Sequence, residues 1–376
     1  MMPFKILVVD DSIFMRKMIS DLVLGDAQFQ VIATAKNGKE AIELTRSLKP
    51  DAITMDIEMP EMNGLDALKV IMEEMPTPVI MLSSLTQDGA RETIVALERG
   101  AVDFVGKPSG SISLDLHRVK EILLEKLHIA VKTNVTKFRV NPILPSPQLK
   151  IKPSQINEAL TPNKAEPASI KPQAGKKDLP IQVQQIVAIG TSTGGPRALH
   201  QVISQIPAHF PAPVVVVQHM PPNFTKSLAQ RLHSVSELNV TEAEDGMVLK
   251  NGHVYIAPGG FHMTVARNGP GLYKIHISKE EARGGHRPCV DTLFESLLPL
   301  KELKRHIVLM TGMGADGAKG MLALKNAGAI TTIAEAEETC IVYGMPRAAV
   351  ELKCVMHVLP QQEIALKLSQ VVGRQQ

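Results

Sequence analysis

Short apolar runs alternate with amphipathic stretches over the first third of the chain. The segments between the runs keep a helical period; in Lys39–Leu48, for example, apolar residues recur every three to four positions. Apolar runs that alternate with helices predict a parallel sheet covered on both faces. We therefore expect a doubly wound, flavodoxin-like α/β domain over residues 1–125. The runs that predict its strands are Ile6–Val9, Val31–Ala33, Ala52–Met55, Val79–Leu82 and Ala101–Val105.

The same alternation returns after Ile181 and predicts a second doubly wound parallel sheet, with a Rossmann-like arrangement, over residues 181–376. One stretch departs from strand–helix order: Val254–Ala257 is followed by Pro258–Gly260 and then by His262–Ala266, which predicts a β-hairpin with a Gly-containing turn. The predicted strands are Ile186–Ile189, Val214–Val217, Val254–Ala257, Ile307–Met310 and Ala329–Ile333.

Residues 126–180 separate the two predicted domains and show no hydrophobic period. Val131–Pro180 holds eight of the 26 prolines and nine Lys or Arg against three acidic residues, and it is typical of a linker. The surplus of six positive charges exceeds the net charge of +3 for the whole chain, so the rest carries about −3. Neither predicted domain is therefore basic, which argues against nucleic-acid binding.

The sequence predicts a cytoplasmic protein. The three cysteines are odd in number and their spacing fits no metal site, which indicates a reducing compartment. The N-terminus, MMPFKILVVDD, places acids directly after a short apolar run and does not match a signal peptide. No stretch of eighteen apolar residues is present, so we expect no insertion into a membrane.

Acidic residues follow two of the strands predicted in the first domain. Asp10 and Asp11 come after the first strand, and Asp56 comes after the third. The carboxyl ends of parallel strands face one crevice, where these carboxylates would repel one another unless a divalent cation joined them. Oxygen-only ligands favour Mg²⁺. One carboxylate of such a site can also attack a phosphoryl donor and form an acyl phosphate.

Two further polar groups lie at the ends of the fourth and fifth strands. Ser83 can hydrogen-bond a phosphoryl oxygen, and Lys107 supplies a positive charge. A lone acid at a strand end is most often a solvated loop residue, but five such groups in order favour a site. Together with Phe104, they resemble the receiver domain of two-component response regulators. The resemblance implies phosphorylation of Asp56, with Ser83, Phe104 and Lys107 as the switch residues.

A second candidate site begins at the first strand of the second domain. Gly190-Thr191-Ser192-Thr193-Gly194-Gly195-Pro196 matches the G-x-S-x-G spacing that exposes a serine on a sharp strand-to-helix turn. The N–H groups at a helix N-terminus favour a developing negative charge there. A Gly-rich turn can equally hold a phosphate. The alternative is thus a non-enzymatic, receiver-regulated binding module that uses Gly190–Gly195.

The partners of Ser192 favour an enzyme. His219 ends the next apolar strand, and Asp316 follows the strand Ile307–Met310. Three strand ends would thus deliver a Ser, a His and an Asp to one crevice, which is what general-base activation of a hydroxyl requires. The order Ser, His, Asp differs from that of the α/β-hydrolases, which indicates an independent arrangement.

Other residues near these motifs are further candidates. His262, His286 and Asp291 could each be a surface or cap residue, although the loop from His286 to Asp291 is expected to border the crevice. Cys289 is a possible nucleophile, but the sequence places no base beside it and a cysteine is more often simply buried. We therefore favour Ser192.

Five motifs in order resemble the chemotaxis protein-glutamate methylesterases of the CheB family. The resemblance implies Ser192, His219 and Asp316 as the catalytic triad and the Met313 N–H as an oxyanion donor. Thr191 stands where the family commonly has Ala, and Cys289 where it commonly has Ser. The motifs are Ile189-Gly190-x-Ser192-Thr193-Gly194-Gly195-Pro196, Gln218-His219-Met220-Pro221-Pro222, His286-Arg287-Pro288-x-Val290-Asp291, Thr311-Gly312-Met313-Gly314-x-Asp316-Gly317 and Tyr343-Gly344-Met345-Pro346-Arg347.

The same resemblance implies an activity and its partners. The substrates would be γ-glutamyl methyl esters and certain glutamines of methylated chemoreceptors, and the activity would serve chemotactic adaptation. The phosphodonor would be the chemotaxis histidine kinase CheA. Mg²⁺ would serve phosphorylation of the receiver, and the esterase chemistry would need no cofactor.

Overall fold

The computed structural model describes residues 2–107, 113–135 and 182–373. Residues 136–180 of the predicted linker lie outside the described residues. The last helix before them continues to Ala130, past the predicted domain boundary at residue 125, so residues 126–130 are helical.

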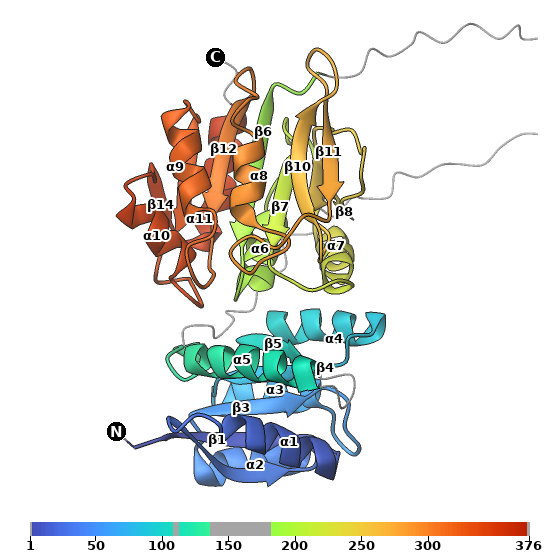
Figure 1. The fold of residues 1–376 in the computed structure, drawn as a ribbon, viewed down its shortest axis with the longest axis vertical. Helices are drawn as coiled ribbons and strands as arrows, with labels where there is room; N and C mark the ends of the chain where they lie inside the picture. Colours follow the sequence, from blue (N-terminus) through green and yellow to red (C-terminus); the bar gives the residue numbers. More distant parts are fainter. Residues whose placement is uncertain (1, 108–112, 136–181, 374–376) are drawn as a thin grey trace, which may run out of the picture. The chain divides into compact units, whose positions relative to one another are not determined.

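The first sheet has five parallel strands in the order β2-β1-β3-β4-β5 (Figure 1). Strand order reverses between β1 and β3, and the crevice for a ligand in such a sheet lies at the carboxyl ends of the strands that flank this reversal. The elements are β1 Phe4–Val9, α1 Ile13–Val23, β2 Phe29–Ala35, α2 Gly38–Leu48, β3 Ala52–Asp56, α3 Gly64–Glu74, β4 Val79–Ser83, α4 Gln87–Glu98, β5 Asp103–Gly106 and α5 Ser113–Ala130.

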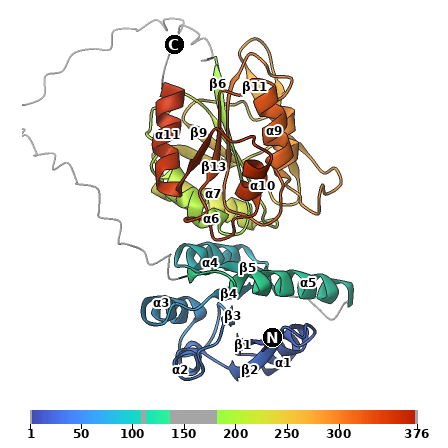
Figure 2. The same cartoon turned by 90° about the vertical axis from the view of Figure 1, so that its left-hand side faces the viewer.

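Helices cover both faces of this sheet. Successive side chains of a strand point to opposite faces, so Leu7 and Val9 pack with α2, α3 and α4, whereas Ile6 and Val8 pack with α1 and α5. Figure 2 shows α2 and α3 on one side of the strands and α1 and α5 on the other. This double cover explains why the strands are continuous apolar runs.

The second sheet has seven parallel strands in the order β14-β13-β12-β6-β7-β9-β8. Both sheets confirm the predicted fold class of two doubly wound α/β domains. The elements are β6 Gln185–Thr191, α6 Gly195–Ile203, β7 Val214–Gln218, α7 Phe224–Val235, β8 Asn239–Glu242, β9 His253–Ile256, β10 His262–Arg267, β11 Tyr273–Ser278, α8 Val290–Ser296, β12 Lys304–Leu309, α9 Ala318–Asn326, β13 Thr331–Glu335, α10 Met345–Glu351, β14 His357–Leu359 and α11 Gln361–Gly373.

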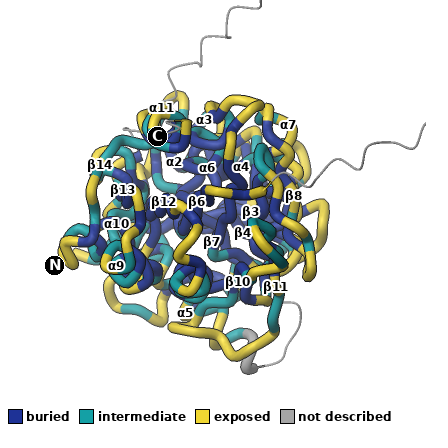
Figure 3. The backbone as a smooth tube through the Cα atoms, turned by 90° about the horizontal axis from the view of Figure 1, so that it is seen from above, coloured by how far each residue is buried: buried dark blue, intermediate teal, exposed yellow. Residues whose placement is uncertain are grey.

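This sheet, too, is packed on both faces. Helices α6, α7 and α11 pack on one face, and α8, α9, α10 and the strands β10 and β11 pack on the other. Every residue of β6 and β7 is buried, as the dark tube in Figure 3 shows. Strand β6 pairs with both β7 and β12, so the ends of these three strands meet at one edge.

The hairpin predicted between Val254–Ala257 and His262–Ala266 is wrong, because only the second of these segments lies in a hairpin. β10 pairs antiparallel with β11, and β9 lies in the parallel sheet between β7 and β8. The physical reason is burial: Val254–Ile256 is covered on both faces, so this segment belongs inside a sheet. The hairpin turn is Asn268–Leu272, in which Gly269 and Gly271 have positive φ angles.

Among the described helices, none combines the length and the apolar character needed to span a bilayer.

Candidate functional site

The ends of β1 and β3 bring three carboxylates together. One ligand oxygen from each of Asp10, Asp11 and Asp56 lies within 4.8 Å of the others. Ser12 fixes the chain here, since its N–H donates to Asp10 Oδ1 at 2.9 Å and its hydroxyl caps α1. Asp10 and Asp56 are buried, and burial raises the pKa of Asp56 to about 6. Crowded carboxylate oxygens of this kind suit a hard divalent cation.

Lys107 neutralises part of this charge. Its Nζ lies 2.7 Å from Asp56 Oδ2 and 3.0 Å from Asp10 Oδ2. Burial would lower the pKa of Lys107, but the hydrogen bonds and charges of the two carboxylates raise it above its usual value. The Lys107 N–H also donates to the Ser83 carbonyl at 2.8 Å, which ties the ends of β4 and β5 together.

Ser83 and Phe104 contact residues other than Asp10, Asp11 and Asp56. The Ser83 hydroxyl accepts a hydrogen bond from Thr93 Oγ1 at 2.7 Å and lies 3.2 Å from the Gly89 carbonyl, both in α4. Phe104 is buried, and its ring stacks on that of Phe224 with centroids 4.5 Å apart. Of the three predicted switch residues, Ser83 and Phe104 thus contact helices, whereas Lys107 contacts Asp56.

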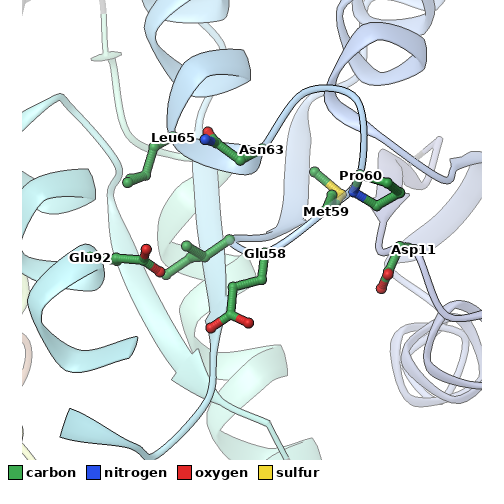
Figure 4. Close-up of a pocket in the computed structure, with 8 residues that line it drawn as sticks. Asp11, Glu58, Met59, Pro60, Asn63, Leu65 and Glu92 are labelled. Carbon is green, nitrogen blue, oxygen red and sulfur yellow. The ribbon is translucent and has the colours of Figure 1, made fainter. Parts of the chain in front are cut away.

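A cavity opens beside the carboxylate of Asp11 (Figure 4). Its wall also contains the carboxylates of Glu58 and Glu92. Burial raises the pKa of Glu92, and the charges of Glu58 and Asp88 add to this effect. The wall therefore favours cations over anions. The lining residues are Asp11, Ile57, Glu58, Met59, Pro60, Asn63, Leu65 and Glu92.

Ser192 lies on a sharp turn between β6 and α6. The turn is closed by a hydrogen bond of 2.8 Å from the Gly195 N–H to the Ser192 carbonyl. Gly194 has a φ of +80°, and a Cβ on Gly195 would lie 1.9 Å from Gln218 Oε1. Glycine is required at both positions, for its positive φ at the first and for lack of space at the second.

Gln218 clamps this turn, a role that the sequence did not reveal. Its Oε1 accepts a hydrogen bond from Thr191 Oγ1 at 2.6 Å, and its Nε2 donates to the Ser192 carbonyl at 2.9 Å. The feature of the sequence that could have indicated this role is a polar residue, Gln218, at the end of the otherwise apolar strand β7. This contact also gives Thr191 a structural role, because an alanine there would leave the Gln218 oxygen without this donor.

His219 and Asp316 form a hydrogen-bonded pair. His219 Nε2 lies 2.8 Å from Asp316 Oδ2. The same carboxylate accepts the N–H groups of Val290 at 2.7 Å and Asp291 at 2.9 Å. Burial alone would raise the pKa of Asp316, but His219 and these N–H groups hold it well below the usual range. Asp316 is therefore an anion that fixes the imidazole.

The other nitrogen of His219, Nδ1, is buried and has no hydrogen-bond partner among the described residues. Because Nε2 donates to an ionised carboxylate, Nδ1 is the nitrogen with a free lone pair in the neutral ring. Within the part of the chain that the structure describes, no hydrogen bond joins it to the Ser192 hydroxyl.

The loop after β12 passes directly against Ser192. The Ser192 N–H donates to the Thr311 carbonyl at 3.0 Å, and a Cβ on Gly312 would lie 2.7 Å from Ser192 Cβ. The Gly312 carbonyl accepts the Met345 N–H at 2.9 Å, which fixes the loop from the other side. The Met313 N–H makes no hydrogen bond with any described residue.

Glu335 is hydrogen-bonded to this loop, and the sequence analysis did not identify it as part of the site. The side chain is fully buried and its Oε2 accepts the Thr311 N–H at 2.8 Å. Burial raises the pKa of Glu335 to about 7. The available signal was an acid that ends the otherwise uncharged strand Thr331–Glu335.

The remaining sequence candidates lie around this site. Cys289 is buried, and its thiol lies 3.2 Å from Asp316 Oδ1. Burial raises the pKa of Cys289 to about 11, so it is a neutral thiol and a poor nucleophile. Asp291 Oδ1 accepts the Gly320 N–H at 2.7 Å and joins α8 to α9. His262 bonds the Glu281 carbonyl at 3.0 Å, whereas His286 stacks on His219.

The first and second sheets belong to one compact unit, and polar contacts link the elements around them. Thr193, next to Ser192, donates a buried hydrogen bond of 2.6 Å to Asp103 Oδ2 at the start of β5. Glu98, at the end of α4, pairs with Arg231 of α7 at 2.9 Å. The chain next to Ser192 is thus bonded to the strand that carries Phe104.

Comparisons with known proteins identify the families of both domains. The family model of the CheB methylesterase matches residues 187–368, and that of the response regulator receiver domain matches residues 6–117. The chain is 48% identical to the protein-glutamate methylesterase/protein-glutamine glutaminase of Geobacillus kaustophilus over 373 residues, which cover 99% of this chain and 100% of the relative. It is 46% identical to the Thermotoga maritima protein of the same name over 369 residues, 98% of each chain.

Among solved structures, the T. maritima CheB methylesterase catalytic domain is 48% identical, covers 50% of this chain and 98% of its own, and gives a TM-score of 0.48. The sequence match to the G. kaustophilus relative covers 99% of this chain, so it includes both domains. The chain therefore belongs to the CheB family of protein-glutamate methylesterases/protein-glutamine glutaminases that carry a response regulator receiver domain.

Proposed function

We propose that this protein is a phosphorylation-activated serine hydrolase that demethylates glutamate methyl esters, and deamidates specific glutamines, on methylated chemoreceptors, and so produces chemotactic adaptation. Relatives of nearly full length bear the corresponding name. The observation that carries the proposal is the His219–Asp316 pair at the end of the strand next to the Ser192 turn.

In the proposed reaction, Ser192 attacks the ester carbonyl while its proton passes to His219 Nδ1. Asp316 stabilises the imidazolium that forms, because it is an anion bonded to Nε2. His219 then returns the proton to the leaving methanol. In the second half, His219 takes a proton from water, which attacks the acyl-enzyme; His219 then returns this proton to the Ser192 oxygen as the bond to glutamate breaks.

The Met313 N–H is the proposed oxyanion donor, since its loop passes against Ser192 and since this group has no partner among the described residues. One such donor contributes roughly 3–4 kcal/mol to stabilisation of the transition state. Deamidation of glutamine passes through the same acyl-enzyme and differs only in the leaving group, which is ammonia.

The receiver domain provides the proposed control. Asp10, Asp11 and Asp56 would hold Mg²⁺, which reduces the repulsion between Asp56 and an incoming phosphoryl group. Asp56 would take the phosphoryl group from the histidine kinase CheA, with Lys107 and Ser83 as ligands of its oxygens and Phe104 as the switch aromatic. Both reactions would occur in the cytoplasm.

Phosphorylation would act on the contacts next to Ser192. Ser83 would have to leave Thr93 and Gly89 to reach a phosphate on Asp56, and this would shift the end of β4 relative to α4. Phe104 and Asp103 follow on β5, and they contact Phe224 and Thr193. The unphosphorylated receiver would thus restrain the site, in a two-state equilibrium that the phosphate shifts.

Methanol release from methylated receptor, with and without a small phosphodonor, tests the activity. Ser192→Ala should abolish turnover while the fold is retained, and Asp56→Ala should keep basal turnover but lose its stimulation. A binding module that uses Gly190–Gly195 would instead keep most of its function in Ser192→Ala.

Cleavage within Val131–Pro180 tests the restraint. It should raise esterase activity in the absence of phosphodonor. A free C-terminal domain that is no faster than the unphosphorylated full chain would refute control by restraint.

A further inference from the structure

The loop between β11 and α8 places a second imidazole on the proposed base. The rings of His286 and His219 are stacked, with centroids 3.8 Å apart and planes inclined by only 10°. Since the rings are nearly parallel, the contact is face to face, and neither ring nitrogen donates a hydrogen bond to the other ring. His286 thus covers one face of the ring whose Nε2 is bonded to Asp316.

The backbone holds His286 in this place. Reciprocal N–H to carbonyl hydrogen bonds of 3.1 Å join Arg283 and His286 across a two-residue turn. Gly284 and Gly285 form that turn with φ angles of +61° and +83°, which suit a tight hairpin turn with glycine at both positions. The Arg283 guanidinium in turn forms a bidentate pair with the carboxylate of Glu295 on α8.

We propose that His286 is a positioning residue for the esterase reaction: its flat ring fixes the plane of the His219 imidazole between Asp316 and Ser192. A hydrogen bond at Nε2 alone leaves the ring free to tilt about the Nε2–Oδ2 direction. A parallel ring at van der Waals distance removes that freedom. This inference rests on the proposed function of His219 as the general base.

The charge state of His286 agrees with this role. Burial, with the positive charge of His219 as a second cause, lowers the pKa of His286 to about 4, against a smaller opposing effect of Asp316. His286 is therefore neutral at neutral pH. A neutral ring does not repel the imidazolium that His219 becomes during catalysis, and its π-face is compatible with a cation.

Three substitutions in the full chain separate shape from charge. His286→Phe keeps a flat neutral ring, His286→Leu fills a similar volume without a flat face, and His286→Lys adds a cation. The exposed residue His209 offers a matched control, His209→Leu. Each variant is assayed for methanol release with phosphodonor across a pH series, and its thermal unfolding is measured.

His286→Phe should retain kcat within about threefold and leave the acid limb of the pH profile in place. His286→Leu should lower kcat about tenfold or more at an unchanged KM, since misorientation of a catalytic group acts on the chemical step. His286→Lys should lower kcat and move the acid limb to lower pH by about one unit, because a nearby cation disfavours the imidazolium form of His219.

Equal activity of the Phe and Leu variants, or loss in proportion to their thermal stability, would overturn the inference. An unmoved acid limb in His286→Lys would overturn it as well. Failure of the proposed function gives a different result, because the wild type and His209→Leu would then release no methanol, or Ser192→Ala would release as much as the wild type.

Discussion

Oδ2 of Asp316 lies 2.8 Å from Nε2 of His219, and both oxygens of this carboxylate accept backbone N–H groups from the start of α8. The start of α8 therefore holds the carboxylate from one side, and the carboxylate still has a lone pair that accepts a hydrogen bond from the imidazole. A helix N-terminus stabilises an anion, so the charge persists although the group is largely buried.

Asp316→Asn should lower kcat by roughly 10³–10⁴, because an amide cannot stabilise the imidazolium and disturbs the choice of tautomer. The amide N–H₂ group would also face a backbone N–H, which should lower the free energy of unfolding by about 1–3 kcal/mol. Methanol release and calorimetric unfolding measure the two effects.

Asp291→Asn is the matched control for this change. Asp291 is buried in the first turn of α8 and accepts the Gly320 N–H, and among the described residues no hydrogen bond joins its carboxylate to His219. It should lose stability and keep kcat within a few fold. Similar kcat losses in both variants would mean that Asp316 acts only through the fold.

Cys289→Ser and Cys289→Ala should both remain active. The thiol only donates a weak hydrogen bond to Asp316 Oδ1, and its pKa of about 11 keeps it protonated at neutral pH. Serine supplies a stronger donor in the same place, and alanine leaves Oδ1 with the Asp291 N–H. We expect kcat within about threefold of the wild type. Loss of activity in Cys289→Ala together with full activity of Ser192→Ala would make Cys289 the nucleophile.

The sequence predicted those parts of the molecule that depend on strand ends. Buried parallel strands are continuous apolar runs, and the residues directly after them meet at one edge, so the order of the runs was enough to place Asp10, Asp56, His219 and Asp316. The hairpin was misassigned because a buried strand and a hairpin strand have similar composition when both are followed by Pro and Gly.

The parts that the sequence did not predict depend on contacts between distant segments. The stacking of His286 on His219, the bond from Thr311 to Glu335 and the bond from Thr193 to Asp103 join residues that no spacing rule relates. Such pairings are fixed by the packing of whole elements: a single sequence can mark a residue such as Glu335 as unusual, but it holds no local signal for the partner.

Asp56→Asn should stabilise the metal-free protein at pH 7. The folded-state pKa of Asp56 is raised from 3.8 to about 6, so the folded state binds this proton more tightly than the unfolded state does. As pH rises from about 4 to about 6, the unfolded state loses this proton before the folded state does, so the free energy of unfolding falls. Above about pH 6, the folded protein carries the full cost of a buried, ionised carboxylate. Asparagine removes this cost, which is of the order of 1–3 kcal/mol.

Calorimetry at pH 4 and pH 7, with and without Mg²⁺, measures this effect. At pH 7, Mg²⁺ should raise the unfolding temperature of the wild type more than that of Asp56→Asn, since the substitution removes one anionic ligand. An unfolding temperature of Asp56→Asn below that of the wild type at pH 7 without metal would contradict the burial argument.

Arg231→Gln should raise the unphosphorylated esterase activity. Arg231 forms a bidentate pair with Glu98, since its Nε lies 2.9 Å from Oε1 and its Nη2 lies 2.9 Å from Oε2. Glu98 also lies 3.1 Å from His200 of α6. Loss of a partly exposed ion pair of this kind should shift the equilibrium between the restrained and the released catalytic domain by about 1 kcal/mol, or roughly fivefold. The measurement is methanol release without phosphodonor, and activity with phosphodonor should change much less.

Arg46→Gln is the control for this substitution. It breaks an ion pair of 2.8 Å with Glu74, which joins α2 to α3 within the first domain. Equal basal activity of Arg231→Gln, Arg46→Gln and the wild type would show that the Glu98 pair does not restrain the catalytic domain.

Glu335→Gln should make the stability of the second domain less dependent on pH. The pKa of Glu335 is raised by burial to about 7, and its ordinary value is 4.5, so folding favours the protonated form. Stability contributed by this group is lost as pH rises from about 4.5 to about 7, a change of roughly 3 kcal/mol at most. Glutamine still accepts the Thr311 N–H but does not ionise.

The sequence has no Trp, so calorimetry of the full chain from pH 5 to pH 8.5 is the suitable measurement. Relative to the wild type, Glu335→Gln should gain stability as pH rises, whereas Glu337→Gln, an exposed control, should follow the wild type at every pH. A difference between Glu335→Gln and the wild type that stays constant over this range would mean that Glu335 is already ionised at pH 5. In that case Arg197, whose charge opposes the effect of burial, would dominate the electrostatics beneath the loop that carries Met313.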